Sequence, residues 1–158
     1  MLEGVKKGKA FEYTDPEVKA RDCTFNPRVM VVRDQHKISV VNMDPIIHDI
    51  QIYEVAPNGS AVMLHRPLRL NPYHPKADAG DHEHRPGELL TDTVQFTKGR
   101  RIFFLECGFH AYMQAWGVSV DNPYYAITDT QGHFTLTDVP QGVYTLVAWH
   151  PGLRGILS

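Results

Sequence analysis

Three side chains that bind soft metals lie close together in the segment LECGFHAYM. Cys107, His110 and Met113 follow one another at three-residue intervals, directly after the apolar run Ile102–Phe104. A thiolate, an imidazole and a thioether on one short loop suit a soft, redox-active metal ion. The same residues are also compatible with a buried thiol, a surface histidine and a core methionine. The metal interpretation therefore requires a further donor from elsewhere in the chain.

His48 is the candidate for that donor. In the segment VVNMDPIIHDIQIYE, one predicted strand ends at Asn42, the Asp44-Pro45 pair turns the chain, and His48 begins the next strand. Two imidazoles, one thiolate and one weak thioether suit copper that cycles between its two oxidation states. The residue types thus predict a site for one copper ion. Its predicted ligands are His48, Cys107, His110 and Met113.

The elements that must position these donors are predicted to be strands. Residues 29–32 and 36–42 are β-branched runs, residues 48–55 alternate apolar with polar side chains, and residues 92–107 contain two further strands around Lys98-Gly99. No window of a dozen residues shows a helical stripe. We predict an all-β protein, a Greek-key β-sandwich with the donors at one end.

Two segments interrupt the strand pattern. Residues 56–89 are rich in proline, glycine and histidine and are predicted to be a flap outside the sandwich. Their irregularly spaced histidines are interpreted as loop residues, not as a second metal site. These are His65, His74, His82 and His84. The tail YYAITDTQGHFTLTDVPQGVYTLVAWH predicts three short strands joined by turns, a C-terminal β-meander extension.

Length and composition limit the number of domains and the class of protein. The chain has 158 residues, of which 42% are hydrophobic, and can bury the core of one domain with or without a small appendage. Its formal net charge of -2 gives no sign of nucleic-acid binding. No apolar run approaches the roughly 20 residues of a membrane span. A signal peptide is expected to have been removed, because the N-terminal segment has no apolar stretch.

At the candidate ligands the sequence resembles the cupredoxins, the small blue copper proteins. The spacing Cys-x2-His-x2-Met is that of the amicyanin ligand loop, VVNMDPIIHDI resembles the segment with the first histidine ligand, and CTFNPRVMVV resembles a strand of plastocyanin and amicyanin. The resemblance implies a type 1-like copper site and electron transport without enzymatic activity. It also implies a redox partner such as a c-type cytochrome or a dehydrogenase. One departure is Asp49, where cupredoxins usually have asparagine.

The tail resembles part of a carboxypeptidase regulatory-like β-module, over about residues 122–150. Such modules accompany cupredoxin-like domains in exported bacterial proteins, which implies a periplasmic or extracellular location. The expected organisation is an N-terminal extension (1–21), a cupredoxin-like domain (22–121) with the insertion at 56–89, and the partial module (122–158).

Two alternatives stay open at this point. The resemblance places Cys23 near the ligand end of the sandwich, so it is either free or bridged to Cys107, and a bridge would remove the thiolate. The protein could also be a non-redox docking or scaffold subunit, or a copper storage or delivery protein.

Overall fold

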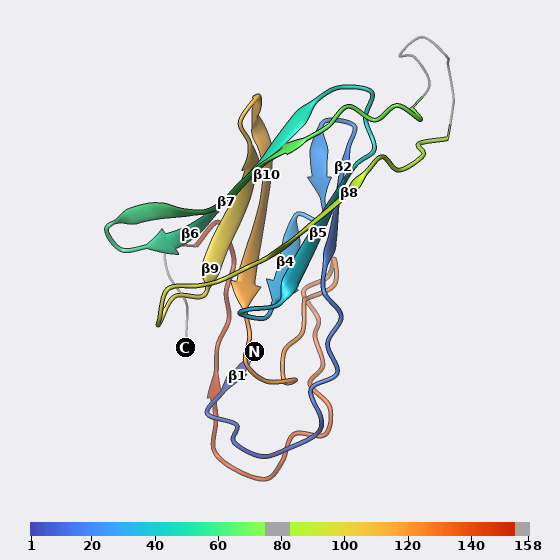
Figure 1. Cartoon of the computed structure of the whole chain (residues 1–158). Coiled ribbons are helices and arrows are strands. Elements are labelled where there is room, and N and C mark those ends of the chain that lie inside the picture. The colour runs from blue at the N-terminus through green and yellow to red at the C-terminus, as the bar shows by residue number, and fades with distance from the viewer. Residues whose placement is uncertain (75–82, 154–158) are drawn as a thin grey trace. The chain divides into compact units, whose positions relative to one another are not determined.

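The computed structural model describes residues 1–74 and 83–153, which divide into two compact units. One unit spans Asp15–Ser119, and the other combines Met1–Thr14 with the segment from Val120 onward. All regular secondary structure within the described ranges is β-strand (Figure 1). In these ranges no helix has the length and hydropathy of a membrane span.

The unit 15–119 contains two sheets. The five-stranded sheet has the order β4 (Val29–Val32), β10 (His110–Ser119), β9 (Ile102–Cys107), β6 (His48–Ala56) and β7 (Gly59–Leu68). The four-stranded sheet has the order β3 (Thr24–Asn26), β2 (Glu17–Arg21), β5 (Lys37–Asn42) and β8 (Leu89–Thr93). Both sheets are mixed, because β4 pairs in parallel with β10 and β2 pairs in parallel with β5.

One hydrophobic core lies between these sheets. Ile50 and Ile52 of β6 and Leu105 of β9 face Val18 and Val40 of the other sheet within a single buried cluster. Alternation of buried with more exposed side chains along strands such as β2 and β9 produces this arrangement, because successive side chains point to opposite faces. Each such aliphatic side chain stabilises the fold by about 1.5–3 kcal/mol. The predicted all-β sandwich is confirmed.

The insertion differs from its prediction. Residues 59–68, expected to belong to an irregular flap, form β7 and pair antiparallel with β6 from His48↔Leu68 to Ala56↔Gly59. The pairing contains a bulge between Ile52 and Tyr53. The beginning of the insertion is therefore a β-hairpin at the edge of the five-stranded sheet.

The start of the sandwich also lies earlier than expected. Residues 17–21, assigned above to an N-terminal extension, form β2 between β3 and β5. Val18 and Ala20 on this strand are fully buried. This strand is therefore an interior strand of the four-stranded sheet.

The second unit contains little regular structure in its described residues. β1 (Leu2–Glu3) pairs antiparallel with β11 (Thr145–Leu146), and the Tyr124 hydroxyl accepts a hydrogen bond from the backbone N–H of Lys9. The described part of the tail forms one two-residue strand where the sequence predicts three.

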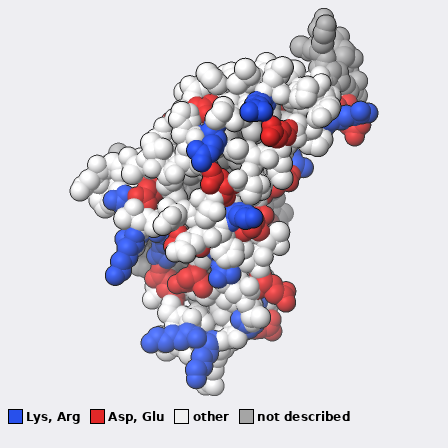
Figure 2. Space-filling view, viewed as in Figure 1, with Lys and Arg blue, Asp and Glu red and all other residues white. Residues whose placement is uncertain are grey.

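Charged side chains of both signs are interspersed on the surface. Figure 2 shows Lys and Arg beside Asp and Glu over the visible face, with no extended area of one sign among the residues described there. This distribution agrees with the small net charge of -2.

Candidate metal centre

Three of the four predicted ligands meet at one end of the five-stranded sheet. Cys107 ends β9 and His110 begins β10, and the two residues are direct partners across a turn formed by Gly108 and Phe109. His48 is the first residue of β6, the strand next to β9. The backbone hydrogen bonds of three adjacent strand ends therefore fix the positions of all three residues.

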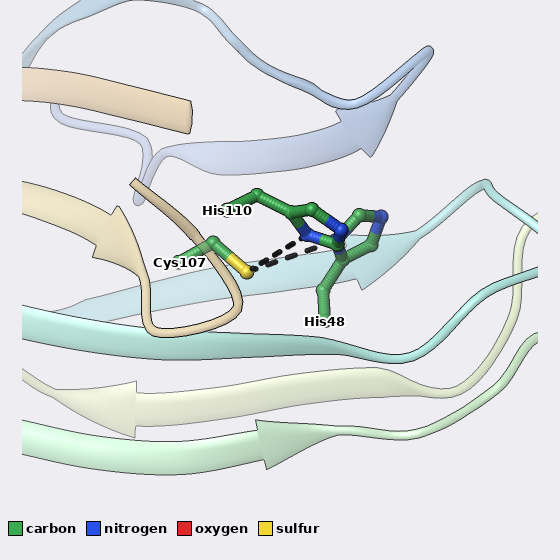
Figure 3. A group of neighbouring side chains, drawn as sticks. All are labelled: His48, Cys107 and His110. Atoms are coloured by element: carbon green, nitrogen blue, oxygen red, sulfur yellow. Dashed lines mark hydrogen bonds between the residues drawn. The ribbon is translucent and has the colours of Figure 1, made fainter. Parts of the chain in front are cut away.

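The two imidazoles face the thiol. The Cys107 Sγ atom lies 3.5 Å from Nδ1 of His110 and 3.8 Å from Nδ1 of His48 (Figure 3). The two rings meet edge to face with centroids 5.2 Å apart. Three atoms that can each donate a lone pair thus converge on one point.

These separations fit a metal ion. An ion bonded at about 2.0–2.1 Å to nitrogen and about 2.3 Å to sulfur, with angles of about 110–120°, places nitrogen and sulfur about 3.6–3.8 Å apart. The observed separations of 3.5 and 3.8 Å are close to this range. A thiolate with two imidazoles favours copper or zinc over hard cations such as magnesium.

The Cys107 sulfur is buried and accepts one backbone hydrogen bond. The Asp49 backbone N–H donates a hydrogen bond to the Cys107 Sγ atom at 3.4 Å. Cys107 is 1% exposed and His48 is fully buried, whereas His110 is half-buried. The amide dipole lowers the cost of a negative charge on this buried sulfur. Only the His110 side of the site approaches solvent.

The turn between the two ligands is held close to the β6 strand. The Asp49 Oδ2 atom accepts a hydrogen bond from Gln51 Nε2 at 2.9 Å and lies 3.0 Å from His65 Nε2. A Cβ atom on Gly108 would lie 2.4 Å from Gln51 Nε2 and 2.6 Å from Asp49 Oδ2. A larger residue at position 108 would therefore displace the ends of the Gln51 and Asp49 side chains.

Asp44 is a component of the site that the sequence analysis treated only as a turn residue. Its Oδ2 atom lies 2.9 Å from His48 Nε2, and the side chain is almost fully buried. Burial raises the pKa of the Asp44 carboxyl. The hydrogen bond from His48 and two backbone hydrogen bonds outweigh burial, so the pKa lies below its ordinary value. The carboxylate is ionised at neutral pH. Its spacing four residues before His48 was the available signal.

Met113 is buried in the core cluster that contains Cys107. It lies on β10, where the pairing with β9 is irregular between His110 and Gln114. Met113 thus lies three residues after His110 with its side chain inside the sandwich, and its role as a ligand stays a prediction.

Cys23 and Cys107 are both free thiols. Cys23 packs against the core cluster, and its thiol near the Tyr112 hydroxyl is the main cause that raises the pKa of Tyr112. Tyr112 is two residues from His110, so Cys23 does lie near the ligand end. The structure has no bridge that would remove the Cys107 thiolate.

The insertion histidines have different environments. His65 lies on β7 and contacts Asp49, and His84 is hydrogen-bonded through Nδ1 to the Met43 carbonyl at 3.1 Å. The His74 and His84 rings are in edge-to-face contact, with centroids 4.7 Å apart. His82 lies outside the described residues. At least His65 and His84 are thus linked to the segments around His48, which the sequence did not indicate.

Comparisons with known proteins give similarities at the level of structure. No family model matches the chain, and no curated protein matches it. A purple cupredoxin from Nitrosopumilus maritimus is 12% identical with a TM-score of 0.45, covering 67% of this chain and 100% of its own. Auracyanin from Roseiflexus castenholzii is 11% identical with a TM-score of 0.48, and the match covers 69% of this chain and 98% of auracyanin. A reduced amicyanin mutant is 13% identical with a TM-score of 0.44, and the match covers 67% of this chain and 82% of amicyanin. Similarities of this size do not assign the chain to a family.

Proposed function

We propose that the protein binds one copper ion through His48, Cys107, His110 and Met113 and acts as an electron carrier. The observation that supports this most directly is the convergence of two Nδ1 atoms on the Cys107 Sγ atom at 3.5 and 3.8 Å. Copper in such a ligand set exchanges one electron between Cu(II) and Cu(I).

The chain's own residues supply the rigidity that electron transfer needs. Cys107 and His48 are held by strand pairing and are nearly inaccessible, so their positions change little when the charge of the site changes. The amide of Asp49 supports the sulfur in both oxidation states. A fixed ligand frame keeps the reorganisation energy small.

His110 is the exit for the electron in this proposal. It is half-buried, and its neighbours Phe109 and Tyr112 are 66% and 69% exposed. Ile47, directly before His48, is 54% exposed. An apolar rim of this kind allows a partner to approach the edge of the site without a large desolvation cost.

The proposal also covers the redox partner, the location of the protein, its lack of enzymatic activity and the role of the tail. We infer a redox partner such as a c-type cytochrome or a dehydrogenase, a location in the periplasm or at the cell exterior, and no catalytic turnover of a substrate. The tail from residue 122 is proposed to be part of a carboxypeptidase regulatory-like module with a docking role.

Visible spectroscopy after addition of one equivalent of Cu(II) tests the proposal. We expect an intense thiolate-to-Cu(II) charge-transfer band, which Cys107→Ser should abolish because it removes the sulfur. His133→Ala, an exposed histidine outside the sandwich, is the matched control and should retain the band. A pale wild-type protein that has bound one Cu(II) would exclude a type 1-like site.

A further inference from the structure

The carboxylate of Asp44 accepts hydrogen bonds from two separate segments of the chain. Its Oδ1 atom accepts the backbone N–H of Asp22 at 2.7 Å, and its Oδ2 atom accepts the backbone N–H of Cys23 at 3.0 Å. Asp22 and Cys23 form the turn between β2 and β3, so the carboxylate joins this turn to the loop before β6.

The Oδ2 atom has one more partner, Nε2 of His48, at 2.9 Å. A backbone amide can only donate, so both carboxylate oxygens of Asp44 serve as acceptors. The Oδ2 atom therefore has to accept from the imidazole as well, which requires a proton on Nε2. In a neutral imidazole with a proton on Nε2, the lone pair is on Nδ1. Nδ1 is the atom that faces the Cys107 sulfur.

We propose that Asp44 is a positioning residue that holds His48 in the tautomer protonated on Nε2 and so directs the Nδ1 lone pair into the metal site. The tautomer is a property of the metal-free chain, whereas its consequence for copper rests on the proposed function. Outer partners of this kind fix the orientation of a ligating histidine and raise its basicity.

The substitution Asp44→Asn keeps the size and shape of the side chain but replaces one acceptor oxygen with an NH2 donor. With the amide oxygen in the place of Oδ2, the oxygen keeps the Cys23 and His48 partners, the NH2 group opposes the Asp22 N–H, and the tautomer is unchanged. With the oxygen opposite the Asp22 N–H, the NH2 group opposes the Cys23 N–H and faces His48 Nε2, which must then accept a hydrogen bond. The proton of His48 moves to Nδ1, and the ligand atom is blocked. In trypsin-like proteases the same Asp-to-Asn exchange beside a histidine leaves the geometry intact and selects the wrong tautomer.

Long-range 1H–15N NMR of metal-free protein at pH 8 reads the tautomer directly. For the wild type we expect a His48 signal with the proton on Nε2. A proton on Nδ1, or on both nitrogens, in the wild type overturns the proposal whether or not any variant folds.

Asp22→Asn is the matched control for the variant. Asp22 is an exposed carboxylate in the turn whose backbone N–H groups donate to Asp44. Its φ of 52° is readily adopted by asparagine. It removes the same charge without touching His48, and its backbone N–H to Asp44 is retained. We expect Asp44→Asn to give a population with the His48 proton on Nδ1 and Asp22→Asn to leave the proton on Nε2. A proton on Nδ1 in Asp22→Asn overturns the proposal, because that variant keeps the Asp44 carboxylate and its contact with His48.

Copper titration then tests the consequence. We expect Asp44→Asn to bind copper roughly 10–100-fold more weakly than the wild type and Asp22→Asn to bind within about threefold of it. A shifted tautomer with unchanged affinity overturns the link to metal binding. A wild type that shows the Nε2 tautomer but binds no copper leaves the role of Asp44 standing and refutes the proposed function.

Discussion

Cys23 lies in a two-residue turn in which both residues have positive φ, 52° for Asp22 and 53° for Cys23. Its backbone N–H donates to Asp44, whereas its side chain packs at the edge of the core near Tyr112. The backbone and the thiol of this residue therefore have separable roles. Only the backbone contributes to the hydrogen bonds around His48.

We expect Cys23→Ala to retain the copper charge-transfer band, because the amide that contacts Asp44 remains and the thiol is not one of the proposed ligands. Thiol titration of denatured, metal-free and unreduced wild type should find two reactive cysteines, since both are free. Loss of the band in a folded Cys23→Ala protein would show that the second thiol takes part in metal binding. A titration that finds no thiols would exclude the ligand role of Cys107.

For individual residues, the sequence predicted the candidate metal-binding side chains well and the residues that support them poorly. Cys107 and His110 are close in sequence, and the chemistry of their side chains is distinctive. The function of Asp44 depends on a turn more than twenty residues away, at Asp22 and Cys23. A local pattern holds no information about such a contact. Sequence reasoning assigned the Asp44-Pro45 pair to a turn, and the four-residue spacing from Asp44 to His48 was its one signal of a further role.

Among the strands, β7 shows why an element can be missed. It is an edge strand, and most of its side chains from Gly59 to Leu68 are exposed, with only Leu64 and Leu68 buried. A strand that is exposed on both faces lacks the alternation of apolar and polar residues that predicts strands. Pro67 is tolerated there because an edge strand leaves some backbone N–H groups unpaired. Strands that are buried on one face, such as β9, were readily predicted.

The contact between β9 and β10 depends on Gly117. A Cβ atom there would lie 2.2 Å from the ring of Phe103, which is fully buried and cannot turn away. We expect Gly117→Ala to lower the free energy of unfolding by about 1–3 kcal/mol through overpacking, as measured by urea denaturation. The double variant Gly117→Ala with Phe103→Leu should cost less than the sum of the two single changes. Additive costs would show that the two residues do not compete for space.

Glu54 connects β6 to the loop before β9. The buried carboxylate accepts hydrogen bonds from the Thr97 amide and hydroxyl and from Arg100 at 2.6–2.9 Å. Burial raises the pKa of Glu54, but these hydrogen bonds and the Arg100 charge outweigh it, so the pKa lies below its ordinary value. Because the folded pKa is depressed, the stabilisation is complete above the unfolded pKa of about 4.3 and is lost as the pH falls below it.

We expect Glu54→Gln to lower the free energy of unfolding by about 1–3 kcal/mol at pH 7. The difference from the wild type should shrink as the pH falls from about 5 toward 3, because protonation of the wild-type carboxyl removes the same interactions. Glu17→Gln, on the exposed side of β2, is the control and should change little. A difference that stays constant between pH 7 and pH 3 would contradict the depressed pKa.

For the whole molecule, the core of the sandwich is contained within residues 15–119. Every residue of the main buried cluster lies in this range, as do His48, Cys107, His110 and Met113. A separate core that is complete in itself is the physical requirement for independent folding. Composition and strand pattern predicted a domain of this class, and the extent of the family resemblance placed its start at Asp22. The strand EVKAR has charged residues on its exposed face and only two apolar residues on the other, so it gave a weak signal.

Truncation of the chain tests whether the sandwich begins at Asp15, as the structure has it, or at Asp22, as the sequence analysis expected. We expect the polypeptide 15–119 to fold cooperatively and to show the same copper band as the full chain. The polypeptide 22–121 lacks β2, which lies between β3 and β5 and buries Val18 and Ala20 completely. Removing an interior strand breaks two ladders of backbone hydrogen bonds and opens the core, a loss comparable with the roughly 5–15 kcal/mol that stabilises a domain. We therefore expect 22–121 to give no cooperative transition in thermal unfolding followed by circular dichroism. A folded 22–121 polypeptide with the copper band would show that β2 is dispensable and that the sandwich begins at Asp22.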